Sequence, residues 1–233
     1  MTDANKDRDQ PMRPKEITSL LALELRLDMR QRHALGGLLL YVVSAVYVCY
    51  LAVQKLVDVP VWNALFWIIL LFAAFNALSR SFMREDGGRQ LYLYTLVDPR
   101  SVILARTLYN ALVMIVLSFL SLGFYVLFLG GDALAKADVG QFLLVTLLGG
   151  VGFAAVLTLI SALAARAGSG LGLMAILGFP VVLPMLLTLM RASRNAIDGL
   201  PWEVNDRYVL WLLAIDALTV ALAWLLYPYL WRD

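Results

Sequence analysis

Six apolar stretches, each about as long as a bilayer is thick, occupy most of the 233 residues. A helix needs about 20 apolar residues to cross ~30 Å of hydrocarbon. Backbone groups cannot go unpaired at that depth, so helices are the expected spanning elements. Hydrophobic residues make up 61% of the chain, more than a soluble domain could bury. The sequence therefore predicts an all-α polytopic membrane protein with six transmembrane helices, at about 35–53, 60–78, 108–129, 142–165, 171–190 and 208–231.

Basic residues are distributed unevenly between the two sides that these spans define. Fourteen of the nineteen lie on the side that carries both termini, and five lie on the other. Because cytoplasmic connections are enriched in Lys and Arg, both termini are predicted to be cytoplasmic.

Two segments precede the first span. Residues 1–14 are polar and mixed in charge, which indicates a disordered tail. Residues 15–32 alternate leucines with charged residues that include Glu24, Arg26 and Arg30. This pattern favours a cytoplasmic helix at the membrane interface, and residues 15–233 are expected to form a single permease domain.

The connection between the second and third spans, residues 79–107, is the main predicted cytoplasmic surface. Gly87 and Gly88 break the helix that leaves the membrane, and Asp98-Pro99 gives a new helix start. A short helix lying parallel to the membrane is expected between these two signals.

Several residues inside the spans are unusual for a bilayer. Pro180 and Pro184 each remove a backbone donor, so a kink or break is expected there, facing the bundle or a dimer partner. Asp216 lies eight residues into the sixth span, where an ionised carboxylate is costly. Two interpretations stay open for it, a hydrogen bond to a neighbouring helix and a role with a substrate or proton.

Catalytic and nucleotide-binding signatures are lacking in the sequence. The chain has a single histidine, His33, and no credible Ser/His or Cys/His catalytic pair. Two interpretations stay open for His33, an interfacial residue and a haem or metal ligand. The glycine-rich run 167–172 lacks the lysine of a phosphate-binding loop. The chain is therefore predicted to be no enzyme and to bind no cofactor, and any ATP must be bound by another polypeptide.

The most specific pattern lies in the internal connection. It contains Ser79-Arg80-Ser81-Phe82-Met83-Arg84-Glu85, then Gly88 to Leu96, Pro99, and Ile103-Leu104-Ala105-Arg106. This pattern resembles the cytochrome c maturation haem-exporter permease B family, CcmB. Leu20 to Arg32 and Gly149 to Leu187 agree with the same family, so the resemblance extends from about Lys15 to the C-terminus.

The resemblance implies an ABC-2-like permease subunit in the bacterial inner membrane. The implied partners are a CcmA-like ATPase, a second copy of the chain, CcmC-like and CcmD-like membrane subunits and a CcmE-like haem chaperone, with no nucleic acid. ATP hydrolysis would be tied to release of the haem-loaded chaperone, and haem would be cargo of the complex. The internal connection would be the ATPase-coupling loop, aided by the interfacial helix, and its candidate residues are Arg84, Glu85, Arg89, Gln90, Tyr92, Tyr94, Asp98, Pro99, Arg100 and Arg106.

The sequence supports two other functions less well. An ABC-2-type permease that exports another lipid or amphiphile would have the same spans, but the loop motif argues against it. A membrane enzyme is disfavoured because no His/Ser, His/Cys or clustered acidic signature is present.

Overall fold

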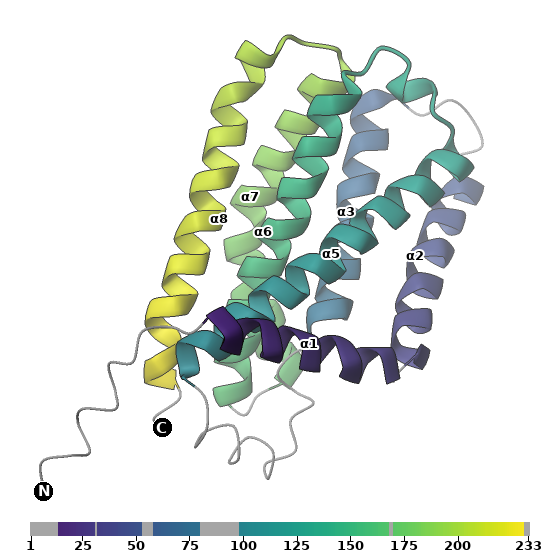
Figure 1. Ribbon diagram of the computed structural model, residues 1–233. Helices are drawn as coiled ribbons and strands as arrows, with labels where there is room; N and C mark the ends of the chain where they lie inside the picture. Colours follow the sequence, from purple (N-terminus) through teal and green to yellow (C-terminus); the bar gives the residue numbers. More distant parts are fainter. Residues whose placement is uncertain (1–13, 31, 53–57, 80–97, 168–169, 231–233) are drawn as a thin grey trace, which may run out of the picture.

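The computed structural model describes residues 14–30, 32–52, 58–79, 98–167 and 170–230 (Figure 1). This part of the chain is helical and contains no strand. Its α-helices are α1 (Pro14–Arg30), α2 (Arg32–Ala52), α3 (Val59–Leu78), α5 (Pro99–Leu129), α6 (Val139–Arg166), α7 (Gly170–Ile197) and α8 (Trp202–Leu230), with a short 3₁₀ turn, η2 (Asp132–Leu134).

Five of these helices, α3 and α5 to α8, are long and apolar enough to cross a membrane. The prediction of an all-α polytopic membrane protein is thereby confirmed. The apolar part of α2, Gly36–Ala52, is shorter, so the sixth crossing stays a prediction. The predicted tail lies outside the described residues except for Pro14, which begins α1.

Three helices extend beyond the spans expected from hydropathy. Helix α5 begins at Pro99, with Asp98 as its N-cap residue in extended conformation. Helix α7 continues to Ile197, and α8 already begins at Trp202. Hydropathy marks the part of a helix that lies in hydrocarbon, whereas charged residues such as Arg100 can continue the same helix outside it.

Helix α6 is the centre of the bundle and packs against α3, α5, α7 and α8. Its glycines allow this close approach. A Cβ added at Gly149 would lie 2.5 Å from the ring of Trp67 on α3, and one at Gly152 would lie 2.5 Å from Asp216 on α8. Small residues of this kind let helix backbones come close where lipid offers no hydrophobic driving force.

A polar cluster joins α3 to α7 in this core. The Asn63 amide donates to the Met190 carbonyl over 2.7 Å, and Ser193 Oγ donates to Asn63 Oδ1 over 2.7 Å. Trp67 Nε1 donates to Ser193 Oγ over 2.8 Å. Interhelical hydrogen bonds of this kind fix which faces of two apolar helices meet.

Helix α7 runs without interruption through Pro180 and Pro184. Both residues are exposed, so they do not face the interior of this chain's own bundle. The predicted break is therefore absent, and a kink at these residues stays a prediction.

Candidate functional site: the crossing of α1 and α5, a buried acid and an apolar groove

Helix α1 lies across the end of the bundle at which α5 begins (Figure 1). Its Leu20 packs against a small buried cluster formed by α5, α6 and α8. The members of that cluster are Val102, Ile103, Leu159, Ala162, Ala223 and Tyr227. Through Leu20, helix α1 thus packs against α5, α6 and α8.

An ion pair joins the same two helices. Arg106 Nε of α5 lies 3.6 Å from Glu24 Oε1 of α1, and the exposed fractions of the two side chains are 5% and 32%. In the sequence these two residues belong to separate predicted segments, the coupling loop and the interfacial helix. The structure brings them together, with the Arg106 side chain buried against α1. Its assignment to the ATPase-coupling loop stays a prediction.

The first turn of α5 also contacts α8. The guanidinium carbon of Arg100 lies 4.4 Å from the ring centroid of Trp224, which is a cation–π geometry. Pro99 occupies the first turn, where its missing N–H has no cost. The segment that ends at Asp98 therefore leads directly into a helix held by both α1 and α8.

The remaining coupling residues lie outside the described part of the chain, in 80–97. They are Arg84, Glu85, Arg89, Gln90, Tyr92 and Tyr94. Arg30 belongs to α1 and His33 belongs to α2. The structure describes the backbone of these two residues but not their side chains. Arg26 is exposed on α1.

Asp216 is buried between three helices, with 7% of its surface exposed. Its carboxyl lies against Gly152 of α6 and near the thioether end of Met185 on α7. Neither carboxyl oxygen has a hydrogen-bond partner among the described residues. One interpretation of Asp216 requires a hydrogen bond to a neighbouring helix, and no described residue supplies that bond.

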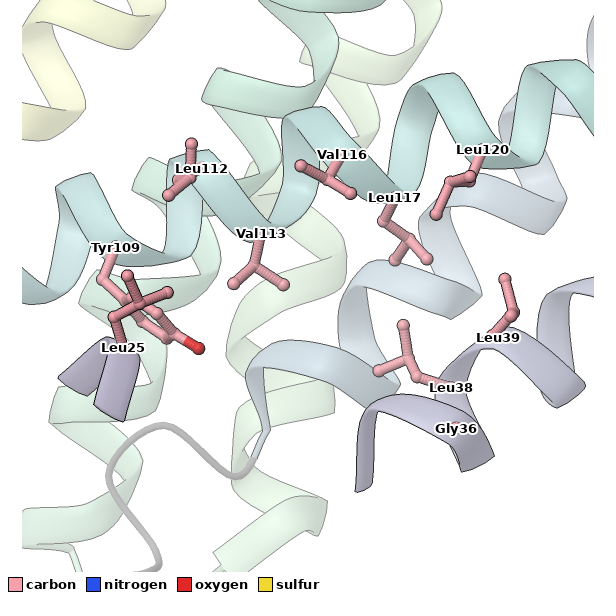
Figure 2. A pocket seen from close by; sticks show the side chains of 10 residues that line it. All are labelled: Leu25, Gly36, Leu38, Leu39, Tyr109, Leu112, Val113, Val116, Leu117 and Leu120. Carbon is pink, nitrogen blue, oxygen red and sulfur yellow. The ribbon is translucent and has the colours of Figure 1, made fainter. Parts of the chain in front are cut away.

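An apolar groove of about 420 Å³ lies between α2 and α5 and is bordered by α1 (Figure 2). Leu25 comes from α1, and Gly36, Leu38 and Leu39 come from α2. The other lining residues follow α5 from Tyr109 to Leu120. The sequence does not predict this groove, because it arises where two apolar helices diverge, and its lining residues have the same composition as side chains that face lipid.

The described ranges contain no metal-binding geometry. No group of three or more His, Cys, Asp or Glu side chains lies close enough there to hold an ion. The candidate sites in the described residues are thus the crossing of α1 and α5, the buried acid and the apolar groove.

Comparison with known proteins identifies the family. The family model described as CcmB protein matches residues 15–228, nearly the whole chain. A comparison with curated proteins found no match. The family match agrees with the motif of the internal connection and with the long apolar helices. The chain therefore belongs to the CcmB family and is a multi-pass membrane component of a haem-export ABC system.

Proposed function

We propose that this chain is the permease subunit that couples ATP hydrolysis on a partner subunit to haem handling and to release of a haem-loaded chaperone during cytochrome c maturation. The family match over residues 15–228 is the observation that carries the proposal. The partners would be a CcmA-like ATPase, a second copy of the chain, CcmC-like and CcmD-like subunits and a CcmE-like chaperone. The complex would lie in the bacterial inner membrane with both termini in the cytoplasm.

The crossing of α1 and α5 supports a mechanical role for this end of the molecule. A push delivered by the ATPase to segment 80–97 would reach α5 at Pro99. Helix α5 is continuous from Pro99 to Leu129, so a displacement at its first turn is carried along its length. The pair of Glu24 with Arg106 makes α1 move with it, and the cluster around Ile103 transmits the movement to α6 and α8.

The experiment uses a strain that lacks this protein. Covalent haem staining measures its c-type cytochromes, and the haem load of the CcmE-like chaperone is measured in the same cells. Loss of cytochromes together with trapped haem-loaded chaperone supports the proposed role and assigns it to the release step. Normal cytochromes would reject the role and leave the ABC-2-type export of another amphiphile as the better explanation.

A further inference from the structure

The carboxyl group of Asp216 lies midway along the bundle. Fourteen residues of α8 precede Asp216 and fourteen follow it, so it lies about 21 Å from either end of that helix at 1.5 Å per residue. Gly152 and Met185, which lie against it, are near the midpoints of α6 and α7. These three are thus the central residues of three adjacent helices, each long enough to cross a bilayer (Figure 1). The carboxyl is therefore at the depth where an ionised group costs most.

The described atoms around this carboxyl offer no hydrogen to it. Neither oxygen accepts a hydrogen bond from a described residue. The hydroxyl of Thr219, one turn further along α8, donates to the Ile215 carbonyl over 2.8 Å. The thioether sulfur of Met185 can accept a hydrogen bond weakly but has no hydrogen to donate. An ionised carboxylate would therefore be buried in this arrangement without a donor.

Positive charges on the same three helices lie far from the central residues. The nearest in sequence are Arg166 on α6, Arg191 on α7 and Arg207 on α8, and all three are exposed. They lie about 21, 9 and 14 Å along their helices from the three central residues. The other ionisable residues of these helices are at least eight positions from the central residues, and they are Arg194, Glu203, Asp206, Tyr208, Tyr227 and Tyr229. No charge on α6, α7 or α8 is therefore placed to balance an ionised Asp216.

The neutral acid fits these surroundings, whereas the carboxylate does not. Burial in apolar surroundings disfavours the charged form of a carboxyl group. The protonated form carries no net charge and brings the one hydrogen that its described neighbours lack. We propose that Asp216 is a proton-binding site inside the membrane, occupied while α6, α7 and α8 are packed together and emptied when they separate.

Release of the proton requires water at the carboxyl. When the helices separate, the O–H bond breaks, the proton passes to water and the bonding electron pair stays on the carboxylate. Proton binding and helix packing therefore stabilise one another, and a rise in pH favours the separated helices. This property belongs to the chain alone and does not rest on the proposed coupling role.

Infrared spectroscopy of the full chain in lipid vesicles tests whether the site is occupied. At about pH 6 carboxyl groups with the ordinary pKa of about 3.9–4.3 are ionised. A protonated carboxyl absorbs at a higher frequency than a carboxylate or an amide, so it gives a separate carbonyl band. We expect this band in the wild type and its loss in Asp216→Asn. The control is Asp206→Asn at an exposed position of the same helix, where the band should remain.

Unfolding in detergent micelles at several pH values tests whether separation of the helices releases the proton. Unfolding exposes Asp216 to water, where an aspartate is ionised above about pH 3.9. From about pH 5 to about pH 6 the unfolding equilibrium constant of the wild type should therefore rise about tenfold relative to that of Asp216→Asn. Asp216→Leu is measured alongside in both experiments, so that poor folding of one variant leaves the other for comparison.

Three results would overturn the proposal. One is a wild-type spectrum at about pH 6 that lacks the band of a protonated carboxyl. Another is a band that persists in the Asp216 variants, which would assign it to another residue. The third is an equal pH dependence of unfolding in the wild type and in the variants, which would mean that packing of the helices does not retain the proton.

Discussion

Asp216 is a carboxyl group that the bundle buries without giving it a hydrogen-bond partner among the described residues. A buried polar group in that state costs about 1–3 kcal/mol of stability. Leucine has nearly the same shape and no polar atom, so Asp216→Leu should raise the unfolding free energy by up to about 1–3 kcal/mol. Denaturation of the purified protein in detergent micelles measures the change. Asp216→Asn keeps polar atoms in the same places and should show no gain.

The same two variants separate a structural role of Asp216 from a functional one. An ionisable residue inside a membrane is retained at a cost in stability, which function commonly offsets. We expect both variants to lower cytochrome maturation although neither lowers the amount of folded protein. Normal maturation in both would leave Asp216 without a functional role. A less stable Asp216→Leu would mean that the carboxyl has a partner outside the described residues.

Gly149 allows α6 to pack against the Trp67 ring, and we expect Gly149→Ala to be destabilising. The new Cβ would lie 2.5 Å from Trp67 Cζ3, and the ring is fully buried and bonded to Ser193. Overpacking of this kind costs about 1–3 kcal/mol. The control is Gly123→Ala on α5, where an added Cβ meets nothing within 4 Å and helix propensity should add up to about 1 kcal/mol. Equal unfolding midpoints for the two variants would contradict this packing of α6.

At the scale of elements, the attachment of α1 to α5 depends on the pair formed by Glu24 and Arg106. Arg106 is almost fully buried, so Glu24→Arg places two cations together and should cost more than the ~1 kcal/mol of an exposed pair. Limited proteolysis should then cleave α1 faster than in the wild type. The double variant Glu24→Arg/Arg106→Glu restores opposite charges and should recover part of the protection.

A double-mutant cycle makes this prediction quantitative. Residues in one ion pair show coupling energies of about 0.5–3 kcal/mol. Additive effects of the two substitutions would contradict the prediction. They would mean that apolar packing of Leu20 positions α1 and that the ion pair does not.

The start of α6 should make stability depend on pH. Asp138 caps this helix by accepting the Gln141 backbone N–H over 3.0 Å, and that bond is the main cause that lowers the pKa of the carboxyl. Its stabilisation is therefore present above the ordinary pKa of about 3.9 and is lost as the pH falls through the lower folded value. Asparagine caps helices equally well without titrating, so Asp138→Asn should flatten the stability curve in this acidic range. An unchanged slope in unfolding experiments would exclude Asp138 as the group responsible.

Elements and contacts differed in how far the sequence could predict them. Long apolar runs predicted the spanning helices, and Asp98-Pro99 predicted the start of α5, because length and capping are local properties. The contact of Glu24 with Arg106 depends on how α1 is folded back over α5, which no local pattern specifies. The same holds for the groove, whose existence depends on the angle between α2 and α5.

For the whole molecule, the positions of α1 and of the end of α8 constrain the number of membrane crossings. Leu20 of α1 and Leu230 of α8 pack against the same buried cluster, so α1 and the end of α8 lie at one end of the bundle. If both lie on one side of the membrane, the chain between them crosses it an even number of times. Five described helices are long enough to cross, and α2 would supply the sixth crossing despite its shorter apolar part.

Cysteine labelling in intact cells tests this topology. The single native cysteine, Cys49, is first replaced by serine. An impermeant maleimide should then label Asp58→Cys and Lys136→Cys from outside, because the positive-inside rule predicts that both exposed positions face away from the cytoplasm. Ala22→Cys, exposed on α1, should react only after the membrane is permeabilised. Labelling of Ala22→Cys and Asp58→Cys from the same side would mean that α2 does not cross, and the chain would then have five spans and termini on opposite sides.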